Sequence, residues 1–208
     1  MKRTTLALLS VVFLLTTIAA STAAFLHVFY DRYEAMARHI GKTLDYDADT
    51  ANAIKHATAA SDMFSALRPV MGDEIAEAAV IRLGVLNEYI ERVIYPNDRD
   101  SAREIMKDLH NNYAGIMAAK LADGSDAFDI IISFGANRTL IVNRIYNPFF
   151  SDKEPKNDVV AYGYEWFKEH HSEIDQRIEK KVARAKDLRA FNPIQLSNLK
   201  SKSTYAIE

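Results

Sequence analysis

Apolar residues dominate the first 30 positions of the chain, and charged residues are frequent only after them. From Thr4 to Tyr30 there is no Asp, Glu, Lys or Arg. A helix that crosses about 30 Å of hydrocarbon needs about 20 largely apolar residues, and this run is long enough. The pattern therefore predicts a transmembrane signal-anchor at residues 1–30. The side chains expected to contact lipid include Leu6, Phe13, Leu14, Phe25 and Phe29.

A cleaved signal peptide is the competing interpretation of the same residues. The charged beginning, the apolar stretch and the small residues 19–23 are the features that a signal peptidase recognises. The apolar run continues to Tyr30, beyond those small residues, which favours a retained anchor. Lys2 and Arg3 precede the run, so the positive-inside rule predicts a cytoplasmic N-terminus and a body exported to the periplasmic or extracellular side.

Apolar positions at three- and four-residue intervals predict a helical bundle over residues 31–124. Its expected helices continue the first one to about residue 44 and then cover Ala48–Arg68, Asp73–Tyr95 and a segment that ends near Gly124. The short connection at residues 96–98 predicts that the last two helices form an antiparallel hairpin. The helix that starts at Asp73 has the most regular apolar stripe, which we expect to face the core: Ile75, Ala79, Leu83, Leu86, Ile90 and Val93.

The spacing of apolar residues changes after residue 125. Residues 128–134 and 139–146 are rich in β-branched and aromatic side chains, and Gly135 and Asn137 lie between the two runs. Such runs around a turn predict a β-hairpin over residues 125–148. A lone hairpin is marginally stable in water, so we expect it to pack on the bundle or to pair with another chain.

A helical pattern returns in the last third of the chain. Residues 149–190 predict a linker followed by a long amphipathic helix that packs on the bundle or forms a seam with another chain, and residues 191–208 read as a tail without periodicity. The predicted fold class is therefore mainly α. It comprises a transmembrane signal-anchor helix, an exported helical bundle with one β-hairpin, and a long C-terminal amphipathic helix.

Charge and composition exclude several classes of function. Residues 31–179 contain 17 basic and 26 acidic side chains, whereas residues 180–208 contain seven basic and two acidic ones. The acidic body argues against non-specific nucleic-acid binding, which needs Lys and Arg to neutralise phosphates. The chain has no Cys, which excludes disulfides, thiolate metal sites and Cys nucleophiles.

The densest group of candidate metal ligands lies at residues 165–175. On a helix, His171 and Asp175 share a face and supply two ligands for a divalent metal. Protein sites need three or four ligands, and no nearby residue completes the set, so these two are weak metal candidates only. Spacings typical of catalytic triads, phosphate-binding loops or dinucleotide-binding motifs do not occur. The sequence therefore predicts no catalytic residue and no cofactor.

Four aromatic residues gather at the start of the last predicted helix. Aromatic side chains are enriched at the energetic centres of protein interfaces, so we expect a partner to bind here, with a place in the core as the alternative. The residues are Tyr162, Tyr164, Trp166 and Phe167.

Three functional hypotheses follow from these patterns. The first is a membrane-anchored structural or interaction subunit of a multi-protein cell-envelope assembly, which contacts lipid through its N-terminal helix and binds other envelope proteins or itself. The second is an exported helical domain that senses or binds a small molecule. The third is a metal-assisted hydrolase that uses His171.

Overall fold

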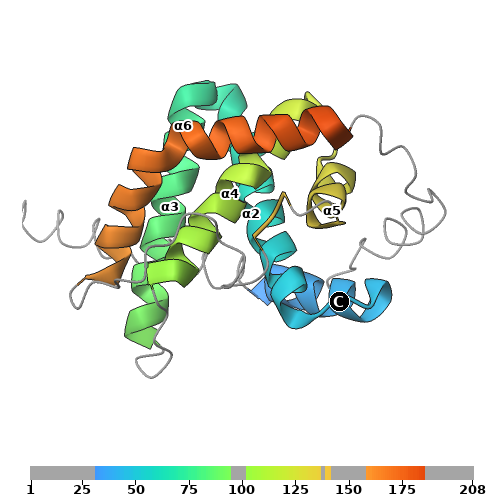
Figure 1. The fold of residues 1–208 in the computed structure, drawn as a ribbon, viewed down its shortest axis with the longest axis horizontal. Helices are drawn as coiled ribbons and strands as arrows, with labels where there is room; N and C mark the ends of the chain where they lie inside the picture. The colour runs from blue at the N-terminus through green and yellow to red at the C-terminus, as the bar shows by residue number, and fades with distance from the viewer. Residues whose placement is uncertain (1–30, 95–101, 137–138, 142–157, 186–208) are drawn as a thin grey trace, which may run out of the picture.

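The computed structural model describes residues 31–94, 102–136, 139–141 and 158–185 (Figure 1). Within these ranges the protein is a bundle of helices, as predicted, and contains no strand. None of these helices is both long and apolar enough to cross a membrane. The anchor expected at residues 1–30, including its predicted lipid-facing side chains, lies outside the described residues, and so do residues 142–157 and the tail.

Among the described residues, five helices follow a helix at residues 31–44. They are α2 (Ala48–Met71), α3 (Asp73–Ile94), α4 (Ala102–Ala122), α5 (Phe128–Ala136) and α6 (Val159–Ala185). The backbone N–H of Thr50 donates to the Asp47 carboxylate over 2.7 Å, which caps α2. Gly124 adopts φ 86° just after α4, as expected of a glycine that terminates a helix.

α4 is the central helix of the bundle and packs against α2, α3, α5 and α6 (Figure 1). α3 and α4 run in opposite directions, as predicted (Figure 1). The closest approach joins α2 and α4, where a Cβ added at Gly115 would lie 1.9 Å from the carbonyl oxygen of Ala57. The two backbones are in contact here because the crossing point has no side chain between them. α6 extends across one side of the bundle, over α3 and α4.

The predicted β-hairpin is wrong in its first half, because residues 128–136 form α5. The Asp126 carboxylate accepts the backbone N–H of Phe128 over 2.9 Å and so caps the helix. Ile131, Ile132 and Phe134 are buried in the core. β-branched residues have only a slightly lower helix propensity, and packing against α2 and α4 outweighs it. Residues 139–141 form no strand, and residues 142–148 of the second predicted strand lie outside the described ranges.

The apolar stripe of α3 does not all face the core, contrary to the prediction, since only Ala79, Leu83 and Ile90 are partly buried. Ile75, Leu86 and Val93 are 62%, 42% and 81% exposed. The core side of α3 presents smaller residues instead, among them Ala76, Val80 and Gly84. Small side chains let α3 approach α2 and α4 closely, and Ile75, Leu86 and Val93 are left on the outside.

Candidate functional site

Polar side chains are buried along the central helix α4. Those on its N-terminal half are Glu104, Lys107, Asp108, His110, Asn111 and Asn112. Burying a charge costs several kcal/mol unless a partner compensates it, so these groups must interact with one another or with neighbouring helices. α4 is therefore where a polar site can form inside the bundle.

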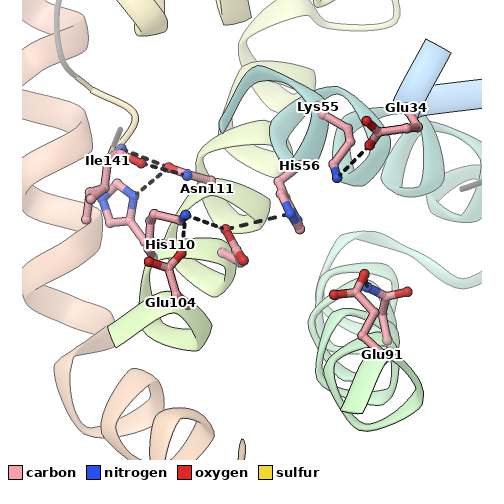
Figure 2. A network of polar contacts seen from close by, with 11 residues as sticks. Glu34, Lys55, His56, Glu91, Glu104, His110, Asn111 and Ile141 are labelled. Atoms are coloured by element: carbon pink, nitrogen blue, oxygen red, sulfur yellow. Dashed lines mark hydrogen bonds and ion pairs between the residues drawn. The ribbon is translucent and has the colours of Figure 1, made fainter. Parts of the chain in front are cut away.

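One end of this polar region is a network of buried charges that reaches α2. Lys107 forms an ion pair with Glu104, and its Nζ lies 3.7 Å from the Asp108 Oδ1. The same Oδ1 lies 3.6 Å from the His56 Nε2 on α2 (Figure 2). His56 thus joins α2 to a network that otherwise belongs to α4.

The protonation states in this network follow from burial and from the neighbouring charges. Burial lowers the pKa of His56 to about 3, and the charges of Lys55 and Lys107 act in the same direction, so its imidazole is neutral at pH 7. Burial raises the pKa of Asp108 against the opposing effect of Lys107. Burial alone would lower the pKa of Lys107, but Asp108 and Glu104 raise it above its usual value, which keeps the ammonium charged.

A pocket of about 70 Å³ lies beside His56, between α2 and α3. One wall comes from α2 and the helix at residues 31–44, the facing wall from α3, and a further residue from α4. Its lining residues are Tyr33, Lys55, His56, Ala59, Met63, Leu83, Gly84, Asn87, Glu88, Glu91 and Asn112. The pocket therefore combines apolar surface with cationic, anionic and neutral polar groups.

Charges are distributed unevenly between the two walls of this pocket. On the α2 side, the Lys55 ammonium lies 3.3 Å from a Glu34 carboxylate oxygen and is directed towards it (Figure 2). On the α3 side, Glu91 accepts a hydrogen bond of 2.7 Å from the Asn87 side chain, one turn before it. Glu88, which is buried, belongs to the same wall. The α3 wall is thus acidic, and the cation opposite it already has a counterion.

A glycine shapes the pocket from the α3 side. A Cβ added at Gly84 would lie 2.5 Å from the Asn112 side-chain nitrogen. Any larger residue at this position would displace the Asn112 amide from its place in the lining. Glycine within a helix costs about 1 kcal/mol relative to Ala, so its presence here fits the close approach of α3 and α4.

The second candidate surface is the outer face of α3. Ile75, Leu86, Tyr89 and Val93 are the large apolar side chains exposed along it. The Tyr89 hydroxyl donates to the Asp158 carboxylate, just before α6, with 3.1 Å to either oxygen. These side chains lie along a helix of 22 residues, with the exposed Arg82 between Ile75 and Leu86, and exposed apolar patches rimmed by polar residues mark binding surfaces.

The two weak metal candidates, His171 and Asp175 on α6, make polar contacts with neighbouring helices. The Tyr113 hydroxyl donates to the Asp175 Oδ1 over 2.9 Å, and the His171 Nε2 lies 3.5 Å from a Glu77 carboxylate oxygen. The His171 ring also contacts the Tyr113 ring edge-on, with 4.5 Å between centroids. Among the described residues, no group of three His, Asp or Glu side chains is placed to hold a metal ion. These two residues connect α6 to α3 and α4.

The four predicted interface aromatics do not form one surface. Phe167 is buried and contacts Tyr113 edge-on. Trp166 is partly buried and stacks on His170, with 4.4 Å between ring centroids. Tyr164 is partly buried, with the Lys168 ammonium 4.9 Å from its ring centroid, and Tyr162 is exposed. The cluster is therefore divided between core and surface along the turns of α6.

Comparison of the chain with protein-family models, with curated proteins and with solved structures finds no match. The fold therefore brings no functional assignment from a relative.

The sequence alone did not identify the residues that line the pocket. One feature of the sequence could have indicated their position. Lys55, His56, Glu88 and Glu91 are spread over two helices whose relative rotation the spacing of apolar residues did not determine. The available signal was Gly84, since an isolated glycine within a helical pattern often marks a close approach of another element.

Proposed function

We propose that this chain is a membrane-tethered interaction subunit whose helical body binds a helix of a partner protein along the outer face of α3. The supporting observation is the exposure of Ile75, Leu86, Tyr89 and Val93, of which Ile75 and Val93 are mostly exposed. Burial of apolar surface is the main driving force of association. The apolar run at residues 4–30 supports the membrane tether, which would hold this face near partners in the same membrane.

The spacing of the exposed positions indicates that the partner is a helix. Positions 75, 79, 82, 86, 89 and 93 alternate steps of four and three residues. This is the seven-residue repeat by which one helix packs its side chains between those of another. The seam is occupied by Ile75, Ala79, Arg82, Leu86, Tyr89 and Val93.

The charge within the seam favours a different protein over a second copy of this chain. Arg82 is exposed in the middle of the seam and forms no ion pair with any residue of the described ranges. The acidic residues of α3 all lie outside the seam: Asp73, Glu74, Glu77, Glu88 and Glu91. Two α3 seams packed together would therefore bury both arginines against apolar side chains or against each other. A partner helix with an Asp or Glu opposite Arg82 avoids that cost.

Site-specific crosslinking tests this proposal, because the chain has no Cys and a single one can be introduced without background. Cysteine at Leu86 or Val93 would carry a photoreactive maleimide probe in native membranes. Matched controls carry the probe at Ser172 or Gln176, which are exposed on α6. We expect both seam positions to label one and the same protein, within a helical segment of it, and the control positions not to label it.

A charge reversal supplies the second part of the test. Arg82→Glu should abolish the seam adduct, and replacing the acidic residue of the labelled partner segment by Lys should restore it. Three results would each refute the proposal: equal labelling from the α6 controls, adducts that contain only two copies of this chain, or labelling that Arg82→Glu leaves unchanged.

A further inference from the structure

We propose that the pocket between α2 and α3 binds a small neutral, apolar molecule, such as a hydrocarbon of about three carbon atoms, against Ala59, Met63 and Leu83. The pocket lies on the inner side of α3, whereas the seam proposed to bind a partner lies on its outer face. It would therefore give the chain a ligand-binding activity that does not depend on the proposed partner.

The charged side chains of the pocket are already paired within the protein. The Lys55 ammonium on the α2 wall lies 3.3 Å from a Glu34 carboxylate oxygen (Figure 2). On the α3 wall, Glu91 accepts a hydrogen bond of 2.7 Å from the Asn87 side chain, and both Glu88 and Glu91 interact with further residues of the chain. A charged ligand would have to displace one of these partners and leave a charged group without compensation, which is strongly unfavourable in a largely buried site.

The neutral polar side chains of the pocket are paired as well. The Tyr33 hydroxyl donates to the Asp62 carboxylate, and the side chains of His56 and Asn112 are hydrogen-bonded to each other. A ligand with a hydroxyl or amide group would therefore gain a hydrogen bond here only by breaking an existing one. An apolar ligand breaks none, so the pairing within the protein favours a ligand without polar groups.

The surface that remains for a ligand is made of carbon and sulfur atoms. Ala59 and Met63 lie one turn apart on α2, and Leu83 lies beside Gly84 on the facing wall of α3. Methionine is flexible and polarisable, so its side chain adapts to the shape of an apolar molecule. A water molecule in a cavity needs about two to four polar partners. Because the polar groups here are occupied, water is held weakly and an apolar molecule can displace it.

The volume of the pocket limits the ligand to a few atoms. An engineered cavity of about 150 Å³ accommodates benzene, which has six carbon atoms. A pocket of about 70 Å³ therefore accommodates roughly three carbon atoms on the same scale. Cyclopropane has this size and contains no polar atom.

Cyclopropane gas, applied under pressure to the full-length chain in a zwitterionic detergent, tests the proposal. The gas pressure fixes the free concentration of the probe, whatever amount dissolves in the micelles. The readout is the set of amide NMR signals from α2 and α3. We expect saturable shifts with a Kd on the order of 10 mM, the range for burying three methylene groups. Ethanol and ethylammonium have as many non-hydrogen atoms, and neither should produce these shifts.

Three pocket variants and one control place the binding site. Ala59→Leu should abolish binding by filling the pocket without changing its charge. Ala78→Leu is the same substitution at an exposed position of α3 outside the lining, and this variant should bind as the unmodified chain does. Leu83→Ala and Met63→Ala enlarge the pocket from its two walls. Each enlarged variant that folds should bind benzene, which the unmodified chain should exclude.

Several results would overturn the proposal. They are unchanged binding by Ala59→Leu, equal loss of binding in Ala78→Leu, and shifts of similar size with ethanol or ethylammonium. Benzene binding equally to the unmodified chain and to the enlarged variants would contradict the location of the site. An absence of saturable shifts up to five times the expected Kd, on the order of 50 mM, would also overturn it. Because the seam crosslinks are measured on the outer face of α3, failure of one proposal leaves the result for the other intact.

Discussion

Acid should destabilise this protein through His110, and the size of the effect follows from the residue's surroundings. His110 lies on the central helix and is 1% exposed. Its Nδ1 lies 3.4 Å from the Asn111 side-chain oxygen, and its Nε2 has no hydrogen-bond partner among the described residues. Burial lowers the pKa of His110 to about 3, and the charges of Arg177 and Lys181 on α6 add to the effect.

The sign and size of the pH dependence come from comparing the folded and unfolded states. The unfolded chain binds a proton at His110 below its ordinary pKa of 6.5, whereas the folded protein does not until about pH 3. Stability from this group is therefore complete above pH 6.5 and is lost as the pH falls towards 3. At about 1.4 kcal/mol per pH unit and proton, lowering the pH from 7 to 5 removes about 2 kcal/mol from the free energy of unfolding. His56 contributes with the same sign, but the raised pKa of Asp108 beside it acts in the opposite direction.

Denaturant unfolding of His110→Gln at pH 7 and pH 5 measures this contribution, because Gln stays polar and does not titrate. The loss of unfolding free energy between the two pH values should be about 2 kcal/mol smaller than in the unmodified chain. Gln176→Ala, exposed on α6 and without a titrating group, should leave the loss unchanged. If His110→Gln loses as much stability as the unmodified chain between pH 7 and 5, the assignment of acid sensitivity to this residue is wrong.

Three further substitutions test the packing around α4. Gly115→Ala should cost about 3 kcal/mol or more, because the new Cβ meets the backbone of Ala57. Gly163→Ala should cost less, about 1–3 kcal/mol, because its Cβ would lie 2.7 Å from the Ile105 side chain rather than against backbone, and equal melting temperatures for the two variants would contradict this contrast. Asn111→Ala should cost about 2–4 kcal/mol by removing bonds of 2.9 and 3.0 Å to the N–H and C=O of Ile141. Amide exchange at Ile141 no faster than in the unmodified chain would refute that role.

The spacing of apolar residues predicted most helices of the bundle, but it predicted a strand where α5 forms. Periodic apolar positions with Asp47 and Gly124 at the ends place α2 and α4 close to their observed bounds. Residues 128–134 have the composition of a strand, but they are short, and a short apolar run does not distinguish a buried helix from a buried strand. Contacts with α2 and α4, distant in sequence, determine that they form α5.

The orientation of α3 shows why neither candidate surface followed from periodicity alone. Ile75, Leu86 and Val93 belonged to the clearest apolar stripe, yet close packing through Ala76 and Gly84 leaves these three on the outside. A hydrophobic stripe predicts that a helix face is buried, but it does not show whether the same chain or a partner protein buries it. The same rotation brings acidic residues of α3 to face Lys55 and His56 across the pocket.

His171 and Asp175 show what helical spacing can and cannot predict about a site. Their spacing correctly placed them on one face of a helix, and that face is directed towards α4. Which residues lie opposite is a tertiary property, and the structure puts Tyr113 and Glu77 there. Similarly, the chain order gave no indication that the polar N-terminal half of α4 would be enclosed by α2, α3 and α6.

The contact between Gly115 and Ala57 has a mechanical consequence for the membrane tether proposed above. A pull applied at residue 31 passes from the first helix into α2 through the hydrogen bond from Tyr33 to Asp62 and the ion pair between Glu34 and Lys55. At the crossing with α4 the backbones touch without intervening side chains, so no compliant layer absorbs displacement. Tension would therefore move α2 and α4 as one stiff body, and the first parts to yield would be the polar contacts at residues 33–62.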